Sequence, residues 1–258
     1  MNTQKNNTNN AAATLSKESV IEIHHLQKGF GEMPVLKDVS LNLYKGENLV
    51  VLGKSGSGKS VLIKCIARLL TADSGTIEVL GTNISTLKGD ALSELRKKLG
   101  FLFQLGALYD SMTVKHNLEF PLRRIKKNLS EKEISEKVME VLENVGLADV
   151  LDKMPSELSG GMRKRISLAR TIIVDPQIML YDEPTTGLDP VTSDEISALI
   201  NLVQKKYQTS SIIITHDIEC ARATANRMIM LKDGQVYAEG VIDDFEQSTD
   251  PMMKTFFK

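Results

Sequence analysis

A glycine-rich octapeptide, GKSGSGKS at residues 53–60, constrains the fold of this chain more than any other feature. It follows an apolar run at residues 49–52 and precedes a helix-compatible segment at residues 61–68. A strand, a glycine turn and a helix in this order form a phosphate-binding loop, because glycines let backbone N–H groups close around an anion and the helix N-terminus adds its dipole. The octapeptide therefore predicts a nucleoside triphosphate site at the end of a buried strand.

Two side chains of the octapeptide suit particular parts of a triphosphate. Lys59 supplies a positive charge for the β- and γ-phosphates, and the Ser60 hydroxyl can bind Mg²⁺. An ordinary glycine-rich turn is the alternative, and the strand and helix around the octapeptide make that alternative weaker. The residues that we expect to contact the nucleotide here are Gly53, Ser55, Gly56, Ser57, Gly58, Lys59, Ser60 and Val61.

The composition excludes several classes of protein. A chain of 258 residues can bury a full α/β core, and its net charge of −1 offers no field for sequence-independent binding of nucleic acid. No segment approaches the ~18 apolar residues of a membrane span, and residues 1–17 lack the apolar centre of a signal peptide. We expect a cytoplasmic chain with no membrane span of its own, a disordered tail at residues 1–18, and reduced, buried thiols at Cys65 and Cys220.

Short runs rich in β-branched residues alternate with helical periodicity along much of the chain. This alternation predicts a largely parallel sheet covered by helices, and therefore an α/β fold. The runs expected to form strands are residues 20–23, 35–43, 49–52, 76–80, 178–181, 211–215 and 227–231.

The stretch at residues 104–157 differs from the rest of the chain because it is rich in Leu, Glu and Lys. It contains a helix-start signal, NLSE at residues 128–131, and a stop signal at Gly146. We expect this stretch to be a helical subdomain, inserted into a single nucleotide-binding domain at residues 19–258.

A second motif, IMLYDE at residues 178–183, is an apolar strand that ends in two carboxylates. The carboxyl ends of such strands lie where α/β folds bind their ligands. We expect Asp182 to help hold Mg²⁺ and Glu183 to polarise a water for in-line attack on the γ-phosphorus. A strand followed by an acidic turn is common on its own, but a phosphate-binding loop in the same chain favours the catalytic interpretation.

The third motif, LSGGM at residues 158–162, precedes a helical stretch at residues 163–174 and alone is only a capped helix start. Together with the other two motifs it resembles the signature of ATP-binding cassette (ABC) ATPases, over about residues 20–240. The resemblance implies a P-loop NTPase (RecA-like) fold, with a mainly parallel core sheet, an antiparallel β subdomain and an inserted α-helical subdomain. It also implies hydrolysis of ATP with Mg²⁺.

The resemblance assigns roles to further residues. Gln104 matches the family's Q-loop glutamine, which contacts Mg²⁺ and the attacking water, and His216 matches the switch histidine that contacts the γ-phosphate. Phe30 lies where the family places an aromatic ring against adenine, although tyrosine is usual there. Asp189 belongs to a match to the D-loop. The signature residues expected to contact nucleotide, which in the family is held by a second subunit, are Ser159, Gly160 and Gly161.

Assembly and location follow from the same resemblance. Two chains of the family sandwich two nucleotides, so we expect a homodimer on the cytoplasmic face of the inner membrane, beside integral-membrane permease subunits. ATP would favour the closed dimer because it contacts both halves, and hydrolysis would release that bias. A basic cluster, RRIKK at residues 123–127, could contact lipid head groups or a membrane partner, but a solvated helix face is the favoured interpretation.

Two stretches indicate a subfamily. The Q-loop region at residues 103–114, with its run GALYDS at residues 106–111, resembles the ATPases that drive Mla/Mce-type lipid transporters. Met162, where most importers have glutamine, resembles the same group. We therefore expect an ATPase that drives phospholipid transport.

Two alternatives stay open: the ATPase of another small-molecule transporter, such as an amino-acid importer, and a non-transport ABC protein. The second is disfavoured because the chain holds one cassette and has no net basic charge. Nothing after Asp250 matches a long tail that wraps a partner, so contacts between the C-terminus and a second subunit are left open.

Overall fold

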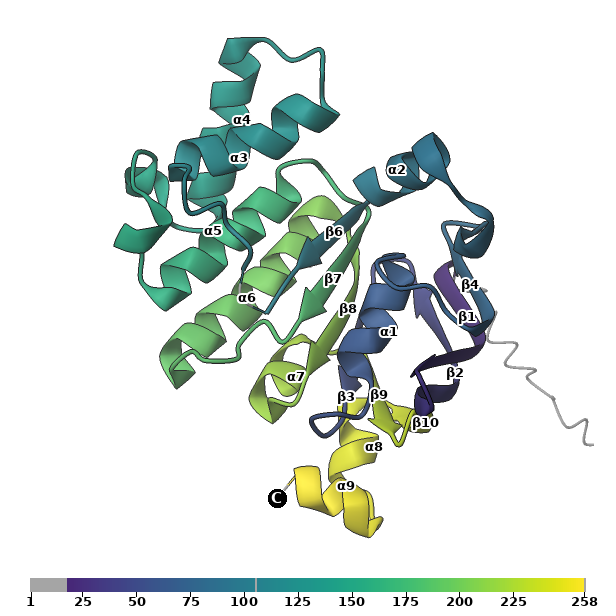
Figure 1. Ribbon diagram of the computed structural model, residues 1–258. Coiled ribbons are helices and arrows are strands. Elements are labelled where there is room, and N and C mark those ends of the chain that lie inside the picture. The colour runs from purple at the N-terminus through teal and green to yellow at the C-terminus, as the bar shows by residue number, and fades with distance from the viewer. Residues whose placement is uncertain (1–17, 105, 258) are drawn as a thin grey trace, which may run out of the picture.

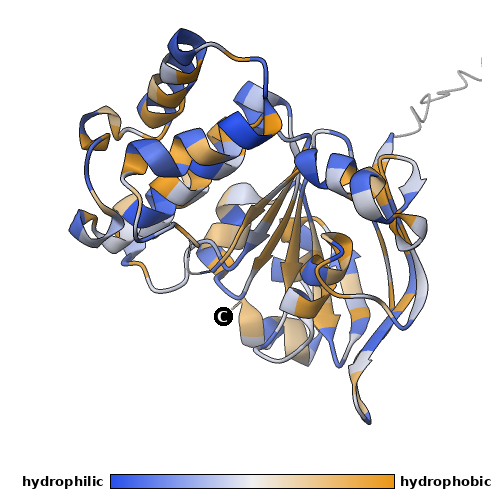
Figure 2. Ribbon diagram, turned by 45° about the horizontal axis from the view of Figure 1, so that its top comes forward, coloured by the Kyte–Doolittle hydropathy of each residue, from blue (hydrophilic) through white to orange (hydrophobic). Residues whose placement is uncertain are grey.

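The apolar runs assemble into one mixed sheet with helices on both faces (Figures 1 and 2). This computed structural model describes residues 18–104 and 106–257, so all but the last residue of the expected N-terminal tail lies outside the described residues. Within them the sheet has ten strands, in the order β5-β4-β1-β2-β10-β9-β3-β8-β7-β6. The strands are β1 (Ser19–Phe30), β2 (Met33–Tyr44), β3 (Asn48–Leu52), β4 (Ser74–Val79), β5 (Thr82–Asn83), β6 (Leu99–Leu102), β7 (Ile178–Asp182), β8 (Ser210–Thr215), β9 (Arg227–Lys232) and β10 (Gln235–Gly240). The α-helices are α1 (Lys59–Ile66), α2 (Gly89–Lys97), α3 (Val114–Ile125), α4 (Glu131–Asn144), α5 (Gly160–Ile172), α6 (Pro190–Tyr207), α7 (Ile218–Thr224), α8 (Ile242–Glu246) and α9 (Pro251–Phe256).

The core of the sheet is parallel. Strands β6, β7, β8, β3 and β9 pair in parallel, and β3, β7 and β8 are buried along their whole length. This burial arises because α1 covers one face of the sheet while α5, α6 and α7 cover the other, as Figure 2 shows by the apolar strands between the two layers. The expected α/β fold with a mainly parallel core sheet is confirmed.

Strands β1, β2, β4 and β5 form the antiparallel part that the resemblance implied, through pairs of β1 with β2 and β4, and of β4 with β5. Strand β10 joins this part to the core, because it pairs in parallel with β2 and antiparallel with β9. Strand β1 is longer than the predicted run at residues 20–23. Its second half carries exposed polar side chains, and His25 has a positive φ of 50° where the pairing with β2 shifts register. The bulge breaks the alternation of apolar and polar residues, which is why the sequence pattern ended early.

The helical stretch contains α3 and α4, followed by two 3₁₀ turns, η2 (Ala148–Val150) and η3 (Pro155–Glu157). Ser130 caps α4: the Glu133 N–H donates to its hydroxyl at 3.3 Å, and the Ser130 N–H donates to the Glu133 carboxylate at 2.8 Å. Gly146 follows the end of α4 with a φ of 68°. The predicted start and stop of this helix are confirmed, whereas the inserted subdomain and the single domain boundary stay predictions.

Acidic side chains pair with two members of the basic cluster on α3 and the residues after it. Arg123 donates to Glu131 at 2.5 and 2.6 Å and to Glu119 at 3.1 Å, which raises the pKa of its guanidinium. The Lys126 ammonium lies 3.2 Å from the Asp175 carboxylate. Such pairs are typical of a solvated helix face, which is the interpretation that the sequence favoured.

Burial and hydropathy bear on two further expectations. Cys65 and Cys220 are free, buried thiols, and burial raises the pKa of each to about 11. Among the described helices, none combines the length and apolar composition that crossing a membrane requires.

Candidate nucleotide-binding site

The octapeptide forms the turn between β3 and α1, and the backbone around it requires glycine at two positions. Gly58 is the N-cap of α1 with a φ of 102°, and a Cβ there would lie 2.7 Å from Cδ2 of Leu36. A Cβ at Gly53 would lie 2.5 Å from the carbonyl oxygen of Leu231. A larger residue at either position would clash with a neighbouring strand. The two glycines therefore allow the loop to pass tightly against these strands.

A cavity of about 780 Å³ opens beside this loop, a volume within the range of small-ligand sites. It brings the loop together with Gln104, Glu183 and His216, which come from distant parts of the sequence. The residues that line it are Val35, Lys54, Ser55, Gly56, Gly58, Lys59, Ser60, Val61, Gln104, Glu183, His216 and Phe256.

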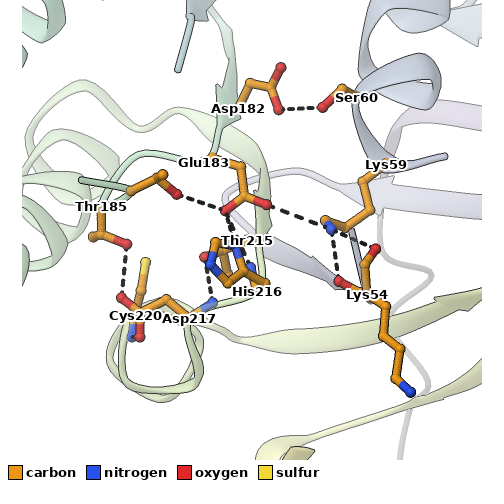
Figure 3. Close-up of polar contacts among 12 residues, drawn as sticks. Lys54, Lys59, Ser60, Asp182, Glu183, Thr185, Thr215, His216, Asp217 and Cys220 are labelled. Carbon is orange, nitrogen blue, oxygen red and sulfur yellow. Dashed lines mark hydrogen bonds and ion pairs between the residues drawn. The ribbon is translucent and has the colours of Figure 1, made fainter. Parts of the chain in front are cut away.

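Lys59 lines the cavity and is only 6% exposed. Its ammonium donates hydrogen bonds to the carbonyl oxygens of Gly53 at 2.7 Å and Lys54 at 3.2 Å (Figure 3). The same nitrogen lies 3.6 Å from a carboxylate oxygen of Glu183. A phosphate chain that enters the loop therefore meets a positive charge already anchored to the backbone around it.

The residues present fit a bound phosphate chain and a magnesium ion. The Ser57 hydroxyl is buried in the loop without a hydrogen-bond partner among the described residues, so its donor is free, and Ser57 lines a pocket that adjoins the nucleotide cavity. The Ser60 hydroxyl donates to the Asp182 carboxylate at 2.9 Å, which places two hard oxygen donors side by side (Figure 3). A bound Mg²⁺ would neutralise charge on the phosphates. Ser60 and Asp182 are the residues that would hold it.

Glu183 directly follows β7, and its carboxylate is fixed by several neighbouring polar groups. Its Oε2 accepts hydrogen bonds from the Thr186 hydroxyl at 3.2 Å and from the backbone N–H of His216 at 3.3 Å. The carboxylate is buried, and the backbone of Glu183 has a positive φ of 51°. This conformation is uncommon for a residue with a side chain and persists only where the surroundings impose it. It turns the carboxylate from the end of the strand toward Lys59 (Figure 3).

His216 joins this network from the end of β8. Its Nδ1 lies 2.8 Å from Oε2 of Glu183 (Figure 3). The following residue, Asp217, caps α7 by accepting from the Glu219 and Cys220 N–H groups, and the Thr185 hydroxyl donates to it at 2.8 Å. These bonds connect the strand end that carries His216 to the loop after β7 that carries Glu183, so the two side chains keep a fixed separation.

The comparison that decides the family is a match between residues 36–186 and a model of the ABC transporter family. This chain belongs to the ABC transporter family. Solved structures agree: a dimeric post-hydrolysis state of the ATP-binding cassette MJ0796 bound to ADP and Pi is 32% identical, with a TM-score of 0.78 over 85% of this chain and 97% of that chain. As an ABC cassette, the chain binds ATP with Mg²⁺ and hydrolyses it.

Curated relatives of the cassette differ in name and length. The methionine import ATP-binding protein MetN 2 of Rhodopseudomonas palustris is 40% identical over 232 residues, which cover 89% of this chain and 61% of that protein. The chloroplastic protein TRIGALACTOSYLDIACYLGLYCEROL 3 of Arabidopsis thaliana is 38% identical over 254 residues, which cover 92% and 73% of the two chains. The chain thus spans less than two thirds of the first of these relatives.

The ABC signature residues lie outside the nucleotide cavity of their own chain, since none is among the described residues that line it. The predicted helix start at residue 163 was wrong: α5 begins at Gly160 and ends at Ile172. The Ser159 hydroxyl caps it by accepting a hydrogen bond from the Met162 N–H at 3.2 Å, one of the N–H groups in the first turn that have no partner within the helix. Both signature glycines therefore lie in the first turn of α5. A Cβ at Gly161 would lie 2.5 Å from Cγ2 of Thr192, so this glycine lets α5 approach α6.

Asp189 caps α6, the helix that follows the D-loop match. Its carboxylate accepts from the Thr192 N–H at 3.0 Å and from the Thr192 hydroxyl at 2.6 Å, and these bonds lower the pKa of Asp189. The structure therefore gives Asp189 a local structural role. Its contact with nucleotide stays a prediction.

Phe30 ends β1 and is 49% exposed, with the Lys28 ammonium 5.4 Å from the centre of its ring. It is not one of the described residues around the cavity. An exposed ring at the surface suits stacking on a base, but its role at adenine stays a prediction.

The sequence interpretation missed Phe256, which comes from α9 and lines the nucleotide cavity. Met252 of the same helix lines an adjoining pocket of about 420 Å³, which shares residues of the loop with the nucleotide cavity. In Figure 1 α9 lies at the end of the chain, near the loop that precedes α1. No local motif signals these residues, because only the folding of α8 and α9 brings them there.

Proposed function

We propose that this chain is the ATPase subunit of a lipid transporter of the Mla/Mce type, on the cytoplasmic face of the inner membrane beside permease subunits. The observation that carries the proposal is the run GALYDS at residues 106–111, and Met162 in the signature supports it. The names of the relatives do not decide the substrate, since one names methionine import and another names a galactolipid.

Tyr109 of the GALYDS run and Phe120 of α3 together form an exposed aromatic surface. These side chains are 42% and 37% exposed, and their ring centres lie 5.3 Å apart in an edge-to-face arrangement. The Arg170 guanidinium lies 4.6 Å from the centre of the Tyr109 ring. Exposed aromatic groups of this kind favour contact with a protein partner.

The buried side chain of Asn117 fixes the backbone of the loop that carries Tyr109. Asn117 of α3 is fully buried, and its amide exchanges hydrogen bonds with the backbone of Tyr109 at 2.8 and 3.0 Å. The same amide donates to the carbonyl oxygens of Met112 and Thr113. The loop is therefore rigidly attached to α3, which suits the transmission of force between a permease and the cassette.

The proposed working unit is a homodimer that encloses two nucleotides. Ser159 and Gly160 are exposed at the start of α5, where a second copy could reach them. ATP contacts both copies in the closed state and shifts the population toward it, and loss of the γ-phosphate contacts reverses the shift. The dimeric state of the similar cassette MJ0796 supports this arrangement.

Amino-acid import is the second candidate function, and the 40% identity to a methionine import ATP-binding protein favours it. Both candidates use the same ATPase chemistry. They differ in the membrane partner and in the substrate that the partner carries, so the partner discriminates between them.

Co-purification tests the proposal. The tagged chain is isolated from native membranes in mild detergent, and the associated proteins and lipids are identified by mass spectrometry. We expect a permease, an Mce-domain protein and bound phospholipid. A permease with a solute-binding protein would assign the chain to amino-acid import, and recovery only in the soluble fraction with ribosomes or DNA would contradict a transporter role.

A pair of variants links that result to the aromatic surface. Tyr109→Glu introduces a charge at the exposed ring, and we expect it to reduce permease recovery at least tenfold while ATP binding is retained. Lys132→Glu on α4 is the matched control, because the Lys132 side chain is 85% exposed and distant in sequence from the Tyr109 loop. Equal recovery of permease with both variants would show that the partner docks elsewhere.

A further inference from the structure

One face of α5 holds the backbone of the Q-loop. The Lys164 ammonium donates a hydrogen bond to the carbonyl oxygen of Gln104, and the Arg170 guanidinium donates to the carbonyl oxygen of Ala107 at 2.8 Å. Between them, a Cβ at Gly106 would lie only 2.6 Å from the Ser167 hydroxyl oxygen. Residues spaced by three along a helix lie on one face, so these side chains act on the loop together.

Lys164 is an unusual residue for its place. The residue is only 5% exposed, and a buried ammonium needs partners that replace water. Burial lowers the pKa of Lys164, while the nearby carboxylates of Asp182 and Glu183 favour its charged form. The lysine therefore lies within the field of the two acidic residues that the reaction uses, although it does not line the cavity formed by the described residues.

Gln104 does line that cavity, together with Glu183 and His216. Its backbone conformation sets where its side chain amide can reach. Since the Lys164 hydrogen bond fixes the carbonyl of that residue, α5 controls the position of the amide relative to Glu183 without touching nucleotide itself.

We propose that Lys164 is a positioning residue for ATP hydrolysis, which acts by holding Gln104 in the geometry that serves the attacking water. The inference rests on the proposed role of Gln104 and not on the transported substrate. Lys164 thereby links the helix that begins at the signature to the catalytic cavity of the same chain.

A double-mutant cycle on the full-length chain tests the proposal. Steady-state ATPase rates are measured for the unmodified chain, Lys164→Met, Gln104→Ala and the double variant, and thermal unfolding confirms that each is folded. We expect Lys164→Met to lower kcat roughly tenfold with little change in KM for ATP, because geometry is lost while phosphate contacts remain. In the Gln104→Ala background we expect the same change to alter kcat less than twofold. Lys132→Met is the matched control and should leave kcat unchanged.

Several outcomes would overturn the inference. An equal fall in kcat in both backgrounds would show that Lys164 acts independently of Gln104, and no fall in either would remove it from the reaction. If Lys164→Met does not fold, Lys164→Gln enters the same cycle, since it keeps an N–H donor but removes the charge and shortens the reach. An unmodified chain that does not hydrolyse ATP would instead contradict the proposed function, so the two failures are distinguishable.

Discussion

Glu183→Gln is expected to abolish turnover while leaving ATP binding intact. The amide keeps the size of the side chain and can still meet His216 and Lys59, so the cavity retains its shape. It cannot accept a proton from water, and loss of a general base typically costs ~10²- to 10⁴-fold in rate. We therefore expect kcat to fall at least ~100-fold with a nearly unchanged Kd for ATP, as measured by a phosphate-release assay and by calorimetry.

The same variant should accumulate a dimer when ATP is added, because the contacts that favour the closed state are no longer removed by hydrolysis. Size-exclusion chromatography with and without ATP measures this. Glu136→Gln on α4, where the side chain is 64% exposed, is the control and should behave like the unmodified chain. Hydrolysis by Glu183→Gln at the unmodified rate would show that another group is the base.

Lys59→Ala is expected to weaken ATP binding itself. The variant removes a buried cation that already points into the loop, and with it a charge-assisted hydrogen bond to phosphate. Such bonds contribute about 1.5–3 kcal/mol, so we expect the Kd for ATP to rise by roughly one to two orders of magnitude. Calorimetric titration measures the change.

The control for this variant is Lys132→Ala, which removes an equivalent charge from an exposed position. If Lys59→Ala bound ATP as tightly as the control, the octapeptide would not be the phosphate-binding loop. The two variants also differ in the constant that they change: Lys59→Ala should raise the Kd for ATP, whereas Glu183→Gln should lower kcat.

Local motifs predicted the parts of the site that short segments determine. The octapeptide needs only its own glycines and the flanking strand and helix, and the IMLYDE run needs only a buried strand with acids at its end. The two motifs meet in the structure, where the Glu183 carboxylate lies 3.6 Å from the Lys59 ammonium, a contact that the sequence analysis did not specify. The positive φ of Glu183 was not predictable, because the surrounding hydrogen bonds impose it and no residue preference announces it.

Long-range packing decided what the sequence did not reveal. Strand β6 has four residues and contains Gly100, which reads as a turn, yet a Cβ there would lie 2.4 Å from the sulfur of Met179. The glycine is needed because the side chains of Met179 on β7 and Thr171 on α5 occupy the space beside it, a requirement visible only after folding. Strand β10 was missed for a related reason: its alternate residues are exposed, so it lacks the apolar run of a central strand.

The place of Phe256 beside the nucleotide cavity has a practical consequence for optical measurements. The chain contains no tryptophan, so Phe256→Trp would give it a single indole whose emission arises from that place alone. Entry of a nucleotide would change the polarity around the ring, and the emission would then follow occupancy in real time. Nucleotide binding to the cassette could then be followed without an attached dye. In a complex with a membrane protein, the part of the emission that changes when ATP is added would identify the signal of this indole.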